Sequence, residues 1–215
     1  FDPARDLLPV VLATHSASML VVHPGLSAKS VKELIALARS QPGQLTAASS
    51  GVGSTVHLIL EMFKASTKTD ILHVPYKGGA PAITDLIGGQ VKLFFNTPGT
   101  LLQHVKSGRV KALATTGPKR LSFLADVPAA NETLKGFEVV NWYGVVAPSG
   151  TPAAVVNRLH AEITKAMAHA ETRDKLIAQG TDPVDSNPKS FSAFMKAEST
   201  KWAGVIKAAN IKFEQ

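Results

Sequence analysis

The most constraining feature of the sequence is an alternation, between residues 45 and 114, of short apolar runs with amphipathic stretches, separated by turns rich in Gly, Pro and Ser. The strand-like runs are residues 45–48, 71–74, 91–95 and 110–114, and the helical stretches are residues 55–64, 80–87 and 101–105. Strands that alternate with short helices are joined by crossover connections, which favour a largely parallel sheet covered on both faces. The sequence therefore predicts an α/β fold.

Two more strands, at residues 8–13 and 19–22, precede this region, and a helix is predicted to begin after Ser30. Ser30-Val31-Lys32-Glu33 is a capping-box pattern, in which the Ser30 hydroxyl accepts from the third helical amide and Glu33 reaches back to the cap amide.

Beyond Arg120 the pattern loosens, and an apolar run returns at residues 142–147. Three helices are then predicted at residues 152–168, 172–179 and 188–209. Thr151 is predicted to cap the first of them, with Pro152 at the first helical position. These helices have apolar faces but no obvious sheet of their own, so we expect them to pack on an N-terminal segment that is missing from this sequence.

The composition excludes several classes of protein. The 215 residues include no cysteine, which excludes disulfides, thiolate metal sites and thiol nucleophiles. No apolar run reaches the roughly 18 residues of a membrane span. The net charge of +7 raises the question of nucleic acid, but the basic residues are scattered singly or in pairs, without a basic run or interleaved aromatics. A positive field that attracts anionic solutes fits this distribution better than nucleic-acid binding.

The most informative segment is residues 48–57, Ala-Ser-Ser-Gly-Val-Gly-Ser-Thr-Val-His, which leads from a strand through a Gly/Ser turn into a helix. Amides at such a turn, hydroxyls and the positive end of the helix dipole suit a carboxylate or a phosphate. A tight turn with Ser54 or Thr55 as helix cap explains the same residues equally well. The glycine signatures of nucleotide sites and the nucleophile-elbow pattern are both absent.

Two further turns repeat the arrangement, at residues 73–82 and 96–100. In a parallel sheet such turns gather at the carboxyl ends of the strands, where ligands bind. Lys77 offers charge and Tyr76 a ring with a hydroxyl, although a surface lysine and a half-buried core tyrosine are the alternative interpretation. The predicted ligand-binding residues are Ser49, Ser50, Gly51, Gly53, Ser54, His57, Tyr76, Lys77, Gly78, Gly79, Ala80, Asn96 and Thr97.

No catalytic residue, metal site or cofactor is predicted. The histidines do not form a ligand cluster, His57 and His73 stand alone on separate elements, and no carboxylate pair lies at the strand ends. Two alternatives to a binding protein stay open: an α/β enzyme acting on an anionic substrate, and the ligand-sensing domain of a transcription regulator. The first requires a perturbed acid, base or metal site, and the second a DNA-binding helix pair elsewhere in its chain.

The order of motifs resembles that of the periplasmic receptors of tripartite tricarboxylate transporters, the Bug or TctC family. The matching stretches are Phe1-Asp2-Pro3 with Asp6 and Pro9-Val10, Val21-Val22-His23-Pro24, Lys32-Glu33-Leu34, Ser49-Ser50-Gly51-Val52-Gly53-Ser54, His57-Leu58, His73-Val74-Pro75-Tyr76-Lys77-Gly78-Gly79, Gly88-Gly89-Gln90-Val91, Trp142-Tyr143-Gly144 and Ala147-Pro148-Ser149-Gly150-Thr151-Pro152.

This resemblance implies a two-lobe, type II periplasmic-binding-protein fold that closes over a small carboxylate and hands it to a membrane transporter. It implies three segments: residues 1–19 as a remnant of the N-terminal lobe with a hinge strand, 20–145 as the α/β ligand-binding lobe, and 146–215 as helices returning to the N-terminal lobe. The family's first, Gly-rich ligand loop has no counterpart here, so the first lobe is expected to be incomplete in this chain.

One position departs from the family pattern. The family usually has an aspartate where this sequence has Asn96, and an asparagine is neutral and both donates and accepts. An amino-acid ligand is therefore disfavoured, and a simple di- or monocarboxylate, aromatic acids included, is expected.

Overall fold

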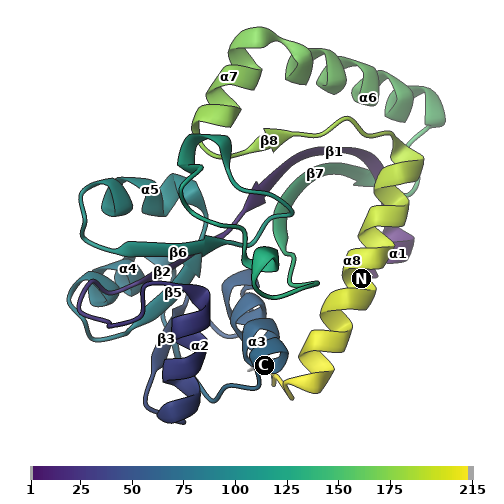
Figure 1. The fold of residues 1–215 in the computed structure, drawn as a ribbon. Coiled ribbons are helices and arrows are strands. Elements are labelled where there is room, and N and C mark those ends of the chain that lie inside the picture. The colour runs from purple at the N-terminus through teal and green to yellow at the C-terminus, as the bar shows by residue number, and fades with distance from the viewer. Residues whose placement is uncertain (1, 213–215) are drawn as a thin grey trace. The chain divides into compact units, whose positions relative to one another are not determined.

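The computed structural model describes residues 2–212. Phe1, which opens the first motif, and the last three residues of the expected 146–215 segment lie outside the described residues. The elements follow in the order α1 (Pro3–Asp6), β1 (Leu7–Ala17), β2 (Met19–Val22), α2 (Val31–Ser40), β3 (Thr46–Ser49), α3 (Thr55–Thr67), β4 (Leu72–Pro75), α4 (Gly79–Ile87), β5 (Leu93–Asn96), α5 (Pro98–Lys106), β6 (Lys111–Thr115), the 3-10 turns η1 (Ser122–Leu124) and η2 (Ala130–Glu132), β7 (Val140–Pro148), α6 (Ala153–Ala168), α7 (Ala170–Ala178), β8 (Asp182–Pro183) and α8 (Pro188–Ala208) (Figure 1).

The chain divides into two units, each with its own sheet. The first unit comprises the residues up to Ser16 together with Asn141–Gly204, and the second comprises Ala17–Val140 with the residues from Val205. No described helix is long and apolar enough to cross a membrane.

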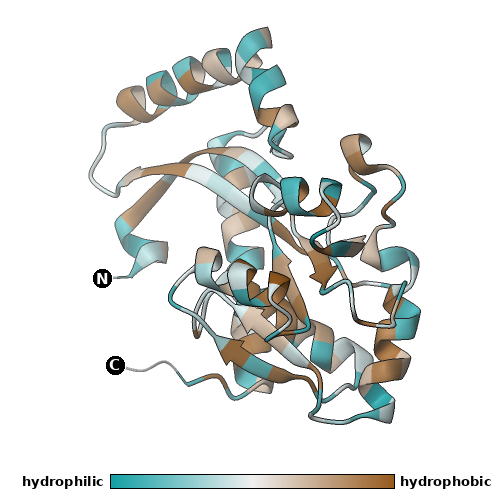
Figure 2. Cartoon of the chain, turned by 90° about the vertical axis from the view of Figure 1, so that its left-hand side faces the viewer, coloured by the Kyte–Doolittle hydropathy of each residue, from teal (hydrophilic) through white to brown (hydrophobic). Residues whose placement is uncertain are grey.

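The second unit contains a five-stranded sheet in the order β4-β3-β5-β2-β6. β3 pairs parallel with β4 and with β5, whereas β2 pairs antiparallel with β5 and with β6. The predicted α/β sheet is therefore present and largely parallel, with one reversed strand that the pattern did not predict. Its central strands, β2 and β5, are mostly hydrophobic (Figure 2), and their apolar side chains are buried.

The predicted strands are found with a small shift. Each of the four runs between residues 45 and 114 forms a strand that begins one or two residues later, and ends one residue later, than predicted. The apolar residues that open the predicted runs, among them Leu45 and Ile71, are buried, but they lie before the paired residues.

The start of α2 confirms half of the predicted capping box. The Ser30 hydroxyl accepts from the Glu33 amide at 3.2 Å, as predicted. The Glu33 carboxylate accepts from the Lys29 amide at 2.9 Å instead of the Ser30 amide, so it closes the turn one residue earlier.

The first unit contains a three-stranded sheet in the order β7-β1-β8. β8 pairs antiparallel with β1, with Thr14 opposite Pro183 and His15 opposite Asp182. The three C-terminal helices lie within two residues of their predicted bounds. The three-stranded sheet belongs to the same unit as these helices, and the sequence pattern did not predict this sheet. Thr151 is not the cap of α6, because Pro152 is the residue before the helix and no side chain caps it.

Candidate ligand-binding site

The candidate site lies at the edge of the five-stranded sheet where three parallel strands end. β3 ends at Ser49, β4 at Pro75 and β5 at Asn96, and Ser49 is paired with Pro75. The segments that follow these strands lead into the N-terminal ends of α3, α4 and α5. Of the ligand-binding residues predicted from the sequence, Ser49 and Asn96 are the last residues of β3 and β5, and the others lie in these segments or in the first turns of α3 and α4, within the second unit.

The loop of residues 49–54 is held by its own side chains. The buried Ser49 hydroxyl oxygen lies 3.1 Å from both the amide and the carbonyl of Gly51. The Ser54 hydroxyl donates to the Gly51 carbonyl at 2.7 Å and accepts from the His57 amide at 3.3 Å, so Ser54 is the N-cap of α3. Gly53 has φ +77°, a backbone conformation that favours glycine. The hydroxyls of Ser49 and Ser54 therefore hold the loop in shape.

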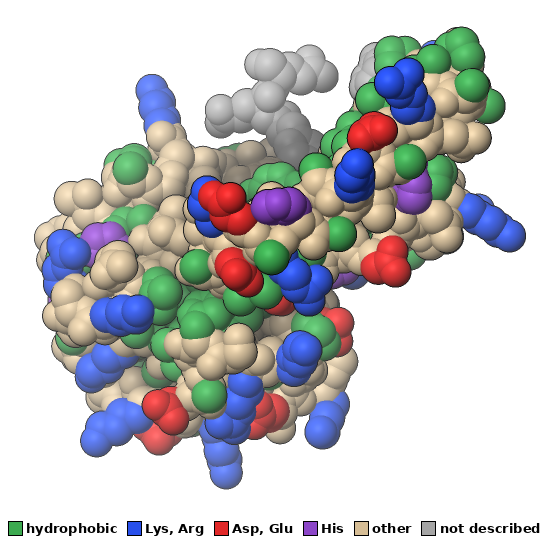
Figure 3. All heavy atoms as spheres, turned by 90° about the horizontal axis from the view of Figure 1, so that it is seen from above, with side chains coloured by type: hydrophobic (Ala, Val, Ile, Leu, Met, Phe, Trp, Pro, Cys, Tyr) green, Lys and Arg blue, Asp and Glu red, His purple; other side chains and the backbone are tan. Residues whose placement is uncertain are grey.

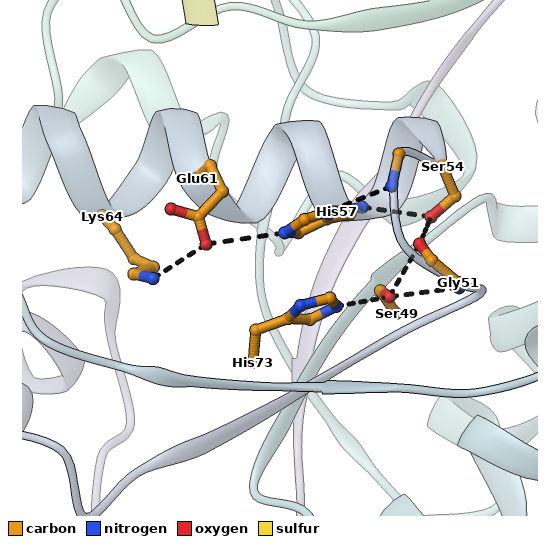
Figure 4. Close-up of polar contacts among 8 residues, drawn as sticks. Ser49, Gly51, Ser54, His57, Glu61, Lys64 and His73 are labelled. Atoms are coloured by element: carbon orange, nitrogen blue, oxygen red, sulfur yellow. Dashed lines mark hydrogen bonds and ion pairs between the residues drawn. The ribbon is translucent and has the colours of Figure 1, made fainter. Parts of the chain in front are cut away.

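His57 lies beneath this loop and is only 6% exposed. Its Nδ1 accepts from the Gly53 amide at 3.1 Å, which requires an unprotonated Nδ1. Its ring stacks on the ring of His73 from β4, with 3.8 Å between centroids and an interplanar angle of 10°. His73 Nε2 in turn lies 2.6 Å from the Ser49 hydroxyl oxygen. Figure 4 shows the His57 ring above the His73 ring, with Ser49, Gly51 and Ser54 of the loop beside them. The two histidines lie on separate elements, as the sequence indicates, but the fold brings their rings into contact, which the sequence did not predict.

Burial keeps both rings neutral. It lowers the pKa of His57, against an attraction from Glu61 that raises it. It also lowers the pKa of His73 to about 4, and the neighbouring His57 and Lys64 lower it further. Both imidazoles are therefore uncharged near neutral pH.

The segment of residues 76–80 is tied to the first loop through the backbone. The Tyr76 amide donates to the Ser49 carbonyl at 3.0 Å, and the Gly78 amide donates to the Ser50 carbonyl at 3.2 Å. The Tyr76 hydroxyl donates to Asp85 of α4 at 2.7 Å, and burial together with this carboxylate raises the pKa of Tyr76 to about 12. These hydrogen bonds therefore hold Tyr76 in place at the start of the segment.

Three residues from three elements meet where the turns converge. The Asn96 side-chain oxygen accepts from the Thr97 amide at 2.8 Å, which fixes the amide and leaves its Nδ2 as a donor. A Cβ added to Gly79 would lie 3.1 Å from Asn96 Nδ2 and 3.9 Å from the Ser50 hydroxyl oxygen. Neither of these donors has a hydrogen-bond partner among residues 2–212, so both are available to a ligand.

The sequence-predicted residues thus fall into two groups. Ser50, Gly79 and Asn96 meet at one point, and the amides of Thr55 and Val56 at the start of α3 have no partner within the described part of the chain. The polar groups that hold the loops belong to Ser49, Ser54, His57 and Tyr76. Lys77 is exposed and has no ion pair in residues 2–212.

Sequence reasoning missed two residues that support the site. His73 is interpreted from the sequence as a histidine alone on its element, and Asp85 lies nine residues beyond its partner Tyr76, without a spacing signal. Trp142 of the quoted motif packs edge-on against Phe191 and Phe194 in the first unit, and Tyr143 is 62% exposed there. No group of three or more His, Asp or Glu residues that could hold a metal occurs in the described residues.

Comparison with solved structures defines the class of protein. A structure titled R. palustris Rpa4515 with adipate superposes with a TM-score of 0.88 at 34% identity, and the match covers 98% of this chain and 71% of that one. MatC from Rhodopseudomonas palustris with bound malate superposes with a TM-score of 0.84 at 28% identity, over 96% of this chain and 71% of that one. The fold is the two-lobe solute-binding fold of periplasmic binding proteins.

The family follows from sequence comparison. Residues 1–211 match the tripartite tricarboxylate transporter family receptor, TctC, and the chain belongs to this family. A UPF0065 protein from the tcbD-tcbE intergenic region of Pseudomonas sp. strain P51 is 38% identical over 208 residues, which are 96% of this chain. The match spans 62% of the length of that relative.

Proposed function

We propose that the protein is an extracytoplasmic, periplasmic receptor that captures a small di- or monocarboxylate, aromatic acids included, and delivers it to the membrane subunits of a tripartite tricarboxylate-type transporter. The observation that carries the proposal is the meeting of Asn96 Nδ2, the Ser50 hydroxyl and the open side of Gly79 at the start of α4. Donors without partners next to a helix N-terminus suit a carboxylate.

The orientation of the Asn96 side-chain amide narrows the ligand class. Its amide has the oxygen turned to the Thr97 amide, so the nitrogen is the group presented to a ligand. A donor there favours a carboxylate oxygen over an ammonium group. Ligands of related proteins support the same class, because the titles of two matching structures name adipate and malate.

A receptor of this kind turns nothing over. The titratable groups nearest the loop, His57 and His73, are stacked beneath it and held neutral. Lys and Arg side chains stand apart on the face shown in Figure 3, interspersed with Asp and Glu, and this spread does not suit nucleic acid.

Part of the apolar surface of the first unit is exposed. The exposed apolar side chains include Tyr143, Val145 and Val146 of β7, and Val155 and Leu159 of α6. We propose that residues outside this sequence cover them in the working receptor and complete its first lobe. Hydrogen exchange of β7 and α6, compared with and without the added lobe, tests this: equal exchange in both would overturn it.

Calorimetric titration with adipate, malate, benzoate and lysine tests the function. We expect binding of at least one acid, no binding of lysine, and an unchanged ligand by mass spectrometry after incubation. Failure of every acid to bind the full-length receptor would refute the carboxylate assignment, and a converted product would refute the receptor assignment.

A further inference from the structure

The His57–His73 pair is built into the support of the ligand loop. The Gly53 amide donates to His57 Nδ1, and the Ser49 hydroxyl that contacts Gly51 also contacts His73 Nε2. One ring therefore fixes the end of the loop that enters α3, and the other fixes the end that leaves β3.

Only one protonation state of His57 fits the loop. An acceptor at Nδ1 places the single ring proton on Nε2, which faces Glu61 Oε1 at 3.8 Å, beyond hydrogen-bond range. A second proton on the ring would sit on Nδ1 and face the Gly53 N–H. Two donors would then oppose each other, and the hydrogen bond that holds Gly53 would be lost.

His73 reacts differently to a proton. Its Nε2 can either accept from the Ser49 hydroxyl or donate to it, so protonation keeps this contact. A charge on His73, however, lies 3.8 Å from the centre of the His57 ring, and a second charge there is strongly opposed. The pair therefore titrates as a coupled unit that takes up one proton first.

The remaining charges around the pair come from α3. Glu61 attracts a proton to His57, but its carboxylate is also paired with Lys64 at 2.8 Å, and Lys64 opposes a charge on either ring. Burial opposes charge on both rings more strongly than Glu61 favours it. The neutral pair is thus the state that the fold selects near neutral pH.

We propose that His57 is the positioning residue of the carboxylate loop: its neutral ring holds the Gly53 amide, and protonation of the His57–His73 pair releases residues 49–54 and lowers the affinity for the carboxylate. This inference rests on the proposed function of the same site. The device makes ligand release sensitive to acid.

The direction of the pH effect follows from the lowered pKa values. A histidine whose pKa is lowered in the folded protein stabilises the fold above its ordinary pKa near 6.5, and this contribution is lost as the pH falls toward the folded pKa. Below that window the protonated pair is accommodated only by a rearranged loop. Loss of affinity is therefore expected as the pH falls below the ordinary histidine pKa near 6.5 toward the lowered pKa values of the pair.

A ligand-independent measurement tests the first step. Nitrogen-15 NMR of the histidine rings of the full-length receptor reports the tautomer and the midpoint of each ring. We expect His57 as the Nε2–H tautomer, a titration midpoint below the ordinary histidine value for both rings, and a Gly53 amide signal that moves with the His57 titration. The proposal would be overturned if the neutral His57 ring carried its proton on Nδ1, or if the Gly53 amide signal did not change as His57 titrates.

A variant tests the second step. In His57→Asn the side-chain oxygen stands near the position of Nδ1 and can accept from Gly53, but it does not titrate at these pH values. The affinity for adipate is measured at pH 4.5 and at pH 7.5 for wild type, for His57→Asn and for the control His169→Asn. His169 is an exposed histidine of the other unit. The ratio of the two affinities is then compared between the three proteins.

Protonation of adipate itself weakens binding equally in all three proteins. We expect wild type and His169→Asn to lose more affinity than His57→Asn over this interval, because only these two proteins keep a ring at position 57 that can take up a proton. Equal losses of affinity in all three proteins would overturn the proposal. The variant His57→Leu has no acceptor for the Gly53 amide, so it should bind adipate weakly at both pH values. If adipate and malate bind at no pH, the proposed function fails, and the ring titration still decides whether His57 positions the loop.

Discussion

Gly79→Ala separates ligand binding from stability, because the two are expected to change in opposite directions. Gly79 is the first residue of α4, and its φ lies outside the left-handed region, so an alanine adopts the same backbone without strain. Replacement of glycine by alanine in a helix contributes between zero and about 1 kcal/mol to the free energy of unfolding.

The added methyl group has a defined place. Its carbon would lie 3.1 Å from Asn96 Nδ2, so that the side-chain amide must shift by a few tenths of an ångström, and 3.9 Å from the Ser50 hydroxyl oxygen. It would thus occupy the space between the two donors that we assign to the carboxylate. Loss of one hydrogen bond to a charged group costs about 1.5–3 kcal/mol, so the affinity should fall by about one to two powers of ten.

Calorimetric titration with the acid that binds best, together with thermal unfolding without ligand, measures both effects. The matched control is Gly204→Ala in α8, where an added Cβ meets open space, and affinity there should not change. Unchanged affinity in Gly79→Ala, with the midpoint of unfolding at or above that of wild type, would refute the placement of the carboxylate. A midpoint several degrees lower would refute the steric argument.

Three further changes test other parts of the structure. Asn96→Asp replaces a donor by a charged acceptor, so the affinity for a dicarboxylate should fall at least about tenfold, and an undiminished affinity in titration would show that residue 96 does not face the ligand. Tyr76→Phe removes the hydroxyl that donates to Asp85, and urea unfolding should show a loss of about 1–2 kcal/mol, whereas no loss would mean that this bond adds nothing to stability. Gly144→Ala places a Cβ against the ring of the fully buried Phe191, closer than the two can approach without a shift, so urea unfolding should show a loss of about 1–3 kcal/mol, and a stability equal to wild type would contradict the close approach.

The order of elements was largely predictable, but strand direction and strand ends were not. Hydropathy detects burial, and residues such as Leu45 and Ile71 are buried without belonging to the paired strand. Polar residues at strand ends, such as Ser49 and Asn96, pair in the sheet and carry no apolar signal. β2 is antiparallel to its neighbours β5 and β6, although the helix α2 follows it in the chain, so the alternation of strands and helices did not reveal its direction.

The site was predictable as a set of turns, but not as a set of contacts. The strand–turn–helix pattern correctly located the turns after β3, β4 and β5, because parallel strands bring their carboxyl ends to one edge. The meeting of Gly79, Asn96 and Ser50 depends on sheet register, which a single sequence does not encode locally. The His57–His73 stack depends on how α3 lies over β4, and no spacing of sixteen residues reveals it.

The distribution of charge ties the basic character of the chain to the site. Residues 17–140 contain thirteen Lys and Arg against seven Asp and Glu, a net charge of +6, whereas residues 1–16 and 141–204 together contain eight of each. The surplus is therefore confined to the unit whose strand ends carry the candidate site. A positive field over that unit raises the local concentration of anions and speeds their association, an effect that weakens with ionic strength. Scattered lysines on one unit thus suit the capture of small carboxylates better than a continuous basic surface would.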